Sequence, residues 1–289
     1  MSQPPLISVI TPVLDGERFI EDAIESVLVQ QYPRFEHVVV DGGSSDGTVE
    51  ILKRYPHLRW ISEPDRGQSD AMNKGFDLST GNVAVYLNAD DYFEPNAFRA
   101  VVPHFRRGAR FVVGRVRVVR DDGPTFIDDP GVELGEMLRW WEPHALSCNS
   151  GGYFYVREVQ EAVGGFNVSN DATMDIEFLL EAALRFRFTK IDDILGTFRL
   201  LPGTKTGDLP WYDHLEFCDR YLEHFDDEYV QRYLRDRKTA KRHLARGTAE
   251  LQLVHGGPSG STSSSVRRIA SNLTRGTRNA AYRLLNRSR

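Results

Sequence analysis

The sequence predicts an α/β protein with a mainly parallel sheet, helices on both faces of that sheet and a helical C-terminal extension. Three observations indicate this class. Strand-like and helical patterns alternate through about the first 120 residues, as a parallel sheet with crossover helices requires. Polar clusters directly follow four of the predicted strands. The chain has 289 residues, of which 40% are hydrophobic, so it can bury a core without disulfide or metal cross-links.

The N-terminal half contains four predicted strand–helix pairs. Strand-like runs are found over Leu6–Val13, which is predicted to be buried, and over His37–Val40, Leu58–Ser62 and Val83–Leu87. Helical spacing and capping residues predict helices over Arg18–Gln30, from Ser44–Asp46 to about Arg54, over Gln68–Leu78 and over Pro95–Phe105.

The pattern is less regular beyond Asp121. A strand is predicted over Phe111–Val119, followed by a turn-rich stretch from Asp121 to Pro130. The remaining predicted elements are a strand over Gly151–Val156, helices over Arg157–Val163 and Thr173–Phe186, and a long amphipathic stretch from Trp211 to about Leu244. Residues 256–265 have the composition of a flexible linker.

Several protein classes are excluded by composition. The longest apolar run, Val83–Leu87, is far shorter than the roughly 18 residues of a membrane-spanning helix. The N-terminus lacks the charged-then-apolar pattern of a signal peptide. Cys148 and Cys218 form no metal or redox spacing, which is typical of a reducing compartment. We therefore expect a cytoplasmic protein rather than a transmembrane, secreted or zinc-finger protein.

Charge is distributed unevenly along the chain. The net charge is −5, yet residues 258–289 contain seven arginines and no acidic residue. An acidic body argues against nucleic-acid binding by the core. In residues 266–289, apolar residues recur at helical spacing among the arginines, so this basic tail can lie on an anionic membrane surface. The alternatives are a disordered solubilising tail or a helix on an acidic face of the body.

The polar clusters fall where an α/β sheet binds its ligands, at the carboxyl ends of the strands. These clusters are Thr11–Asp15, Asp41–Asp46, Glu63–Gly67 and Asn88–Asp91. Four such loops at one sheet edge predict an enzyme.

Two of these loops suggest a chemistry, each with a simpler alternative. The adjacent carboxylates of Asp90 and Asp91 fit a hard divalent cation bound with substrate phosphates, but they can also cap the next helix. Residues 41–48 lack the glycine fingerprint of dinucleotide enzymes and the lysine of P-loop ATPases. The acid and glycines of that loop can approach a base or ribose, or form an ordinary tight turn.

Three segments in order carry a family resemblance. They read SVITPVLDGERFIEDAIESVLVQQYPRFEHVVVDGGSSDGTVEIL, SEPDRGQSDAMNKGFDLSTG and VAVYLNADDYFEP. Together they resemble the family 2 glycosyltransferases, which are inverting enzymes of the GT-A fold that use nucleotide-diphosphate sugars. The resemblance covers about residues 6–200.

The resemblance implies a role for matching positions. The nucleotide pocket would be lined by Thr11, Pro12 and Asp15, and the base would be read by Asp41. Arg66 and Asp70 would face the nucleotide and its phosphates. Asn88 and Asp90 match the ends of the D-x-D motif, whose last acid binds Mg²⁺ or Mn²⁺, with Asp91 as its neighbour. Asp175 matches the second acid of a late E-D pair, the catalytic base.

The sequence departs from the family pattern at three places. Asn88 replaces the first D-x-D acid, so metal binding rests on Asp90, with Asp91 as a second candidate. Met174 replaces the partner of the base. The segment Thr197–Lys205 resembles a late basic loop in which Leu201 replaces a histidine. There Arg199 or Lys205 can neutralise the leaving diphosphate, or the loop is simply solvated.

These observations together predict a metal-dependent hexosyl- or related transferase. The enzyme would move a sugar from a nucleotide-diphosphate donor to a glycan or lipid-linked acceptor, in the synthesis of a surface polysaccharide or glycolipid. If the basic tail binds lipid, the protein would be peripheral on the inner face of the membrane. We expect a GT-A-like domain over 1–210, with its nucleotide-sugar half in about 1–123 and its acceptor half in about 124–210, then a helical extension over 211–255. The alternatives are a non-catalytic nucleotide-sugar-binding or scaffold protein of the same fold and, less supported, a nucleotidyltransferase.

Overall fold

The computed structural model describes residues 3–120, 125–140, 144–147, 149–170, 172–201 and 216–255. The predicted linker over 256–265, the basic tail over 266–289, Cys148 and Lys205 lie outside the described residues. Within the described chain, no helix is long and apolar enough to cross a membrane.

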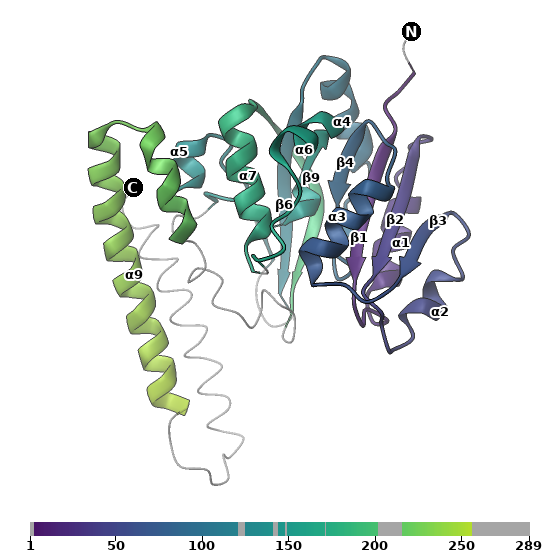
Figure 1. Ribbon diagram of the computed structural model, residues 1–289, viewed down its shortest axis with the longest axis horizontal. Coiled ribbons are helices and arrows are strands. Elements are labelled where there is room, and N and C mark those ends of the chain that lie inside the picture. Colours follow the sequence, from purple (N-terminus) through teal and green to yellow (C-terminus); the bar gives the residue numbers. More distant parts are fainter. Residues whose placement is uncertain are drawn as a thin grey trace. The chain divides into compact units, whose positions relative to one another are not determined.

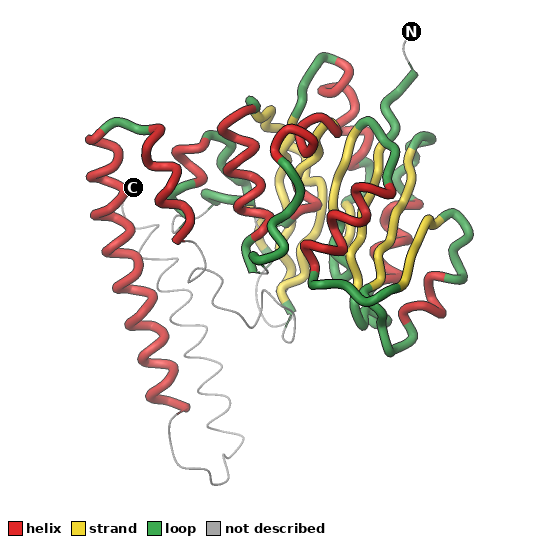
Figure 2. Tube along the Cα trace, in the orientation of Figure 1, coloured by secondary structure: helices red, strands yellow, loops and turns green. Residues whose placement is uncertain are grey.

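The described strands form one sheet in the order β3-β2-β1-β4-β8-β6-β9-β5, with β7 paired to β6. Figures 1 and 2 show this sheet, with β4, β1, β2 and β3 side by side. The strands are β1 Ile7–Val13, β2 Phe35–Asp41, β3 Leu58–Ser62, β4 Val83–Tyr86, β5 Tyr92–Phe93, β6 Phe111–Arg120, β7 Phe126–Asp128, β8 Tyr153–Val156 and β9 Phe188–Leu200. Strands β3, β2, β1 and β4 are parallel, as the sequence predicts. Strand β8 is antiparallel to both β4 and β6, so the sheet as a whole is mixed.

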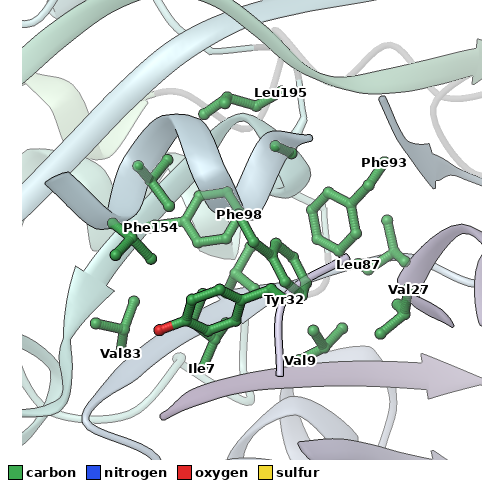
Figure 3. Packing of buried hydrophobic residues seen from close by; sticks show 14 of the residues in the cluster. Ile7, Val9, Val27, Tyr32, Val83, Leu87, Phe93, Phe98, Phe154 and Leu195 are labelled. Carbon is green, nitrogen blue, oxygen red and sulfur yellow. The ribbon is translucent and has the colours of Figure 1, made fainter. Parts of the chain in front are cut away.

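Helices cover both faces of the sheet. They are α1 Ile20–Leu28, α2 Thr48–Leu52, α3 Gln68–Leu78, α4 Ala97–Arg106, α5 Leu134–Met137, α6 Arg157–Val163 and α7 Met174–Arg185, with a 3-10 turn, η1, at Ser150–Gly152. Helices α1 and α4 pack with β1 and β4 around Phe98, whose ring meets Phe93 edge-on at 5.3 Å between centroids (Figure 3). Helices α3, α6 and α7 lie on the other face (Figure 1). There Gly75 of α3 lies so close to β1 that an added Cβ would come within 2.4 Å of Ile10 Cγ2.

The sheet differs from the prediction at β7 and β9. Residues 126–128 form β7 within the stretch predicted to be turn-rich. The sequence analysis did not identify β9, and the prediction of a basic loop beginning at Thr197 is wrong, because residues 197–200 end this strand. The side chains of Asp192 and Asp193 are exposed and interrupt the apolar pattern of β9, which hides the strand from a periodicity analysis.

A second compact unit contains the C-terminal helix α9, Asp227–His255. The 3-10 helix η3, Glu216–His224, precedes it, so the predicted amphipathic stretch is divided in two. Within this unit Arg237 forms an ion pair with Asp219, and Tyr233 is buried. The predicted domain boundaries at 210 and 255 stay predictions.

His37 is a buried, neutral histidine in the first unit. Its Nε2 lies 2.9 Å from the Thr11 hydroxyl, and burial, with a smaller effect of His57, lowers its pKa to about 3. The unfolded chain binds this proton below about pH 6.5, whereas the folded chain does not bind it until about pH 3. Stability therefore falls as the pH drops below 6.5.

We expect His37 to contribute a loss of about 1.4 kcal/mol in the free energy of unfolding for each pH unit below about 6. The measurement is urea unfolding of wild type and His37→Gln from pH 7.5 to 4.5. The stability difference between the two proteins should shrink or reverse toward pH 4.5. A difference that stays constant over this range would show that His37 takes up no proton on unfolding.

Candidate active site

The loops after β1 and β2 are joined by reciprocal hydrogen bonds. Asp15 has a left-handed backbone, φ 49°. Its N–H donates to Ser44 Oγ at 2.8 Å and its Oδ1 accepts the Ser45 N–H at 2.8 Å. The next pair repeats this arrangement, because the Glu17 N–H donates to Asp46 and the Gly47 N–H donates to Glu17. The two loops therefore form one ordered rim at the carboxyl edge of the sheet.

Asp41 lies at the end of β2 and orders the loop that follows. Its side chain is fully buried. It accepts the Ser44 N–H and hydroxyl, together with the Ser62 hydroxyl at 2.6 Å. Direct contact between Asp41 and a base would require Ser44 to move aside.

Thr11 and Pro12 are buried in β1. The Thr11 hydroxyl is occupied by His37, so neither side chain is exposed at the rim. The rim instead presents Asp15 and Leu14, whose exposed fraction is 62%. Leu14 lies within the Thr11–Asp15 cluster, but the sequence analysis gave its side chain no role.

Arg66 and Asp70 form a pair at the start of α3. The Arg66 guanidinium donates to Asp70 Oδ1 at 2.9 Å, and its backbone N–H donates to Oδ2 at 3.1 Å. These hydrogen bonds lower the pKa of Asp70. The Arg66 side chain is 73% exposed, so its guanidinium remains accessible to a phosphate while Asp70 holds one of its NH₂ groups.

The loop after β4 brings Asn88, Asp90 and Asp91 together. Asn88 accepts from Gln68 Nε2 at 3.0 Å and donates to Asp91 Oδ2 at 3.2 Å. Asp91 is buried, and burial together with the Asp90 charge raises its pKa. Burial also raises the pKa of Asp90. Two carboxylates with raised pKa values are an environment that a cation would stabilise.

The donor set fits a cation that is bound mainly by the substrate. Within the described residues, no cluster of three His, Cys, Asp or Glu side chains could hold a metal alone. Mg²⁺ often takes one or two carboxylates and completes its shell with water and phosphate. The oxygens of Asp91 are engaged by N–H donors, which favours Asp90 over Asp91 as the protein ligand.

Arg199 lies near this loop at the end of β9. Its side chain is 17% exposed and pairs with Asp22 at 2.6 Å. The guanidinium lies 4.8 Å from the centre of the Tyr92 ring, and its charge partly offsets the rise that burial causes in the pKa of Asp90. The alternative of a solvated loop is therefore wrong for Arg199. It is a fixed cation beside the acidic loop.

Asp175 occupies the first turn of α7 and is half-buried. Its Oδ1 accepts the Ile176 N–H at 2.9 Å, and its charge, after burial, raises the pKa of Tyr153. Tyr153 begins β8, which is antiparallel to β4. The first residue of β8 therefore lies at the edge where β4 ends. The Asn170 side chain accepts the Thr173 N–H just before α7, and the Asn170 carbonyl accepts the Ser69 hydroxyl in the first turn of α3. The start of α7, which carries Asp175, therefore lies beside the start of α3, at the edge that bears the polar loops.

The comparison with protein families decides the family. The model of glycosyl transferase family 2 matches residues 8–159, which is more than half of the chain. The chain belongs to glycosyl transferase family 2. An uncharacterized glycosyltransferase of Mycobacterium tuberculosis is 30% identical to this family 2 protein over 195 residues, 64% of this chain and 71% of that one.

Other relatives are similar over shorter segments. TuaG of Bacillus subtilis, a proposed teichuronic acid biosynthesis glycosyltransferase, is 38% identical over 93 residues, 30% of this chain. The present chain spans only 36% of the length of TuaG.

The structure is similar to that of S. aureus TarS in complex with UDP-GlcNAc, with a TM-score of 0.62 and 18% identity over 78% of this chain and 69% of that one. This likeness confirms the predicted fold class.

Proposed function

We propose that this family 2 protein is an inverting, metal-dependent glycosyltransferase, a hexosyl- or related transferase, that uses a nucleotide-diphosphate sugar. One observation supports the proposal: four chemically suited side chains lie at the same edge of the sheet, with Arg66 just before α3, Asp90 in the loop after β4, Arg199 at the end of β9 and Asp175 in the first turn of α7. Cations for a diphosphate and a carboxylate base are the parts that such a transfer needs. The UDP and UDP-GlcNAc complexes of TarS make UDP the first nucleotide to test.

Asp175 is the proposed general base. The acceptor oxygen forms a bond to the anomeric carbon while the bond from that carbon to the diphosphate oxygen breaks. Asp175 takes the hydroxyl proton, and the bonding electron pair leaves with the diphosphate. One displacement inverts the anomeric configuration.

Charge that develops on the diphosphate needs fixed cations nearby. Arg66 is exposed and Arg199 is held in place by Asp22 and Tyr92. Asp90 would hold Mg²⁺ or Mn²⁺, which when bound supplies Lewis-acid stabilisation of the phosphate oxygens. Asn88 orients the loop through Gln68 and Asp91.

The acceptor is proposed to be a growing surface polysaccharide or glycolipid. Support comes from relatives named as a teichuronic acid glycosyltransferase and as the chondroitin synthase of Escherichia coli, 31% identical over 111 residues. A second candidate is a non-catalytic nucleotide-sugar-binding protein. This candidate is favoured by one observation: the oxygen and the nitrogen of the Asn88 side-chain amide both already form hydrogen bonds within the protein, to Gln68 and to Asp91.

The distinguishing experiment measures release of nucleoside diphosphate from a panel of nucleotide sugars with Mn²⁺. We expect one donor to be consumed slowly by water and faster with an oligosaccharide acceptor, and EDTA to stop the reaction. If a nucleoside diphosphate binds tightly but no sugar is ever released, the non-catalytic candidate is correct.

Membrane attachment is a further part of the proposal, together with a cytoplasmic location. The basic tail over 266–289 would meet anionic lipid. Exposed cations on α9 support this idea, because Arg232, Arg235, Lys238 and Arg242 recur at spacings of three or four residues. The test is co-sedimentation with anionic liposomes of the full chain and of a chain that ends at Gly257. Equal pelleting of the two would exclude the tail as the anchor.

A further inference from the structure

Asp91 joins three separate segments of the sheet edge. It is 1% exposed. Its Oδ2 accepts Asn149 Nδ2 at 2.6 Å and Asn88 Nδ2 at 3.2 Å, and its Oδ1 accepts the Arg199 backbone N–H at 2.9 Å. The loop after β4, the residue before η1 and the end of β9 therefore meet at one carboxylate.

The orientation of the Asn149 amide is set by its own surroundings. Asn149 is 3% exposed, and its Oδ1 accepts the Gly151 N–H at 2.7 Å. An amide whose oxygen is occupied must direct its NH₂ group to an acceptor, and here that acceptor is Asp91. The Asn149 carbonyl also accepts the Gly152 N–H at 3.1 Å and the Ser147 hydroxyl at 3.1 Å.

The segment around Asn149 is closely packed against the sheet. A Cβ added at Gly151 would lie 2.9 Å from Asn149 Oδ1, and one at Gly152 would lie 2.5 Å from Val116 Cγ2. The backbone therefore approaches its neighbours in a way that leaves no room for a side chain. This packing fixes the position from which Asn149 reaches Asp91.

We propose that Asn149 is a positioning residue for the donor site and that it acts through Asp91. The proposal rests on the proposed function, because the side chains it would hold in place are Asp90 and Arg199. Asp90 precedes Asp91 directly, and the Arg199 backbone is bonded to Asp91. Loss of the Asn149 amide would leave a buried carboxylate short of a donor, so the loop and the end of β9 would shift together. Asp91 is then the anchor of the loop rather than a metal ligand.

The first test compares Asn149→Ala with wild type by two readouts. The first readout uses whichever of ADP, CDP, GDP, TDP and UDP stabilises wild type against heat, and it is the Mn²⁺ concentration that gives half of that stabilisation. This concentration should rise by about 10- to 100-fold in the variant, which is the range for loss of a group that supports a metal ligand. The other is hydrogen exchange of the Arg199 amide, which should accelerate while the amides of β2 are unchanged.

Asn73→Ala is the matched control. Asn73 donates to the Phe166 carbonyl and accepts the Phe166 N–H, both at 2.8 Å, so this variant also loses an amide that makes two hydrogen bonds, here at a half-buried position. It should lower the unfolding temperature without ligand and leave the Mn²⁺ requirement unchanged. An equal rise in that requirement for both variants would show that Asn149 is merely structural.

An exchanged pair tests the contact itself. Asn149→Asp alone brings two carboxylates together, which is unfavourable. Combined with Asp91→Asn, the amide at position 91 can donate to the carboxylate at 149 and still accept the Arg199 N–H, while Asn88 Nδ2 loses the acceptor that it has on Oδ2. We expect the double variant to regain part of the Mn²⁺ response that Asn149→Asp loses, a non-additive result.

The outcomes separate this inference from the proposed function. One outcome is that a diphosphate stabilises wild type and Asn149→Ala at the same Mn²⁺ concentration, that Asp90→Ala loses this stabilisation, and that hydrogen exchange of the Arg199 amide is the same in Asn149→Ala as in wild type. The positioning role is then wrong, and the proposed function stands. If wild type responds to none of the five diphosphates, the proposed function is wrong, and the positioning role falls with it.

Discussion

Asp175→Asn is expected to lower the rate of sugar transfer by about 10²- to 10⁴-fold, the usual contribution of a general base. An amide has nearly the same shape as the carboxylate but cannot take the proton of the acceptor hydroxyl. Because the proposed role of Asp175 is confined to the chemical step, nucleotide binding should change by less than about twofold. The measurements are kcat with a saturating nucleotide sugar and the dissociation constant of the nucleoside diphosphate.

Glu181→Gln is the control for this variant, because it neutralises an acid on the same helix. Glu181 lies in an ion pair with Arg185, about two turns after Asp175, and its loss should leave transfer unchanged. If Asp175→Asn transfers sugar at the wild-type rate, the base is another residue. If it loses nucleotide binding as well as turnover, Asp175 is a structural part of the donor site.

Asp90→Ala is expected to produce the second large effect, a fall of about 10²- to 10³-fold in kcat/KM. Removing one group that stabilises developing charge typically costs this much, or about 2.7–4 kcal/mol of transition-state stabilisation. The variant should also lose the part of diphosphate binding that depends on Mn²⁺. Calorimetric titration of UDP with and without Mn²⁺ measures this part directly.

The control for Asp90 is Asp77→Ala, which removes an exposed acid from α3. It should keep both kcat/KM and the response to Mn²⁺. Equal UDP affinity of Asp90→Ala and wild type at every Mn²⁺ concentration would mean that Asp90 does not hold the metal.

Local patterns were sufficient for the N-terminal half of the fold. The strand over Leu58–Ser62 and the helix over Gln68–Leu78 have the predicted bounds, because strand-like runs and helical spacing are properties of neighbouring residues. The helix that follows the second strand, α2, is shorter than the prediction from Ser44–Asp46 to about Arg54, because it begins at Thr48 and ends at Leu52. Ser44 bonds Asp15 and Asp41, and Asp46 accepts from Glu17 as well as from Thr48, so these residues join loops as well as preceding the helix.

Long-range pairing explains what the sequence could not predict. The register of β9 is set by β6 and β5, and its exposed acids conceal it from a local search. Asn149 is a single polar residue with no motif around it, and its importance follows only from its contact with Asp91 across 58 positions. The residues themselves suggested a ligand role for Asp41 and Asp90, each with a simpler alternative, whereas the role of Asp175 came from the resemblance alone. All three roles stay predictions until variants are measured.

Thermal unfolding of wild type with five nucleoside diphosphates, with and without Mn²⁺, tests the central claim most directly. A ligand at about 100 times its dissociation constant stabilises the folded state by about 2.7 kcal/mol, which raises the midpoint by several degrees for a chain of this size. The account predicts such a rise for one diphosphate, larger with Mn²⁺ than without it. If none of the five shifts the midpoint under either condition, this edge of the sheet is not a nucleotide-sugar site.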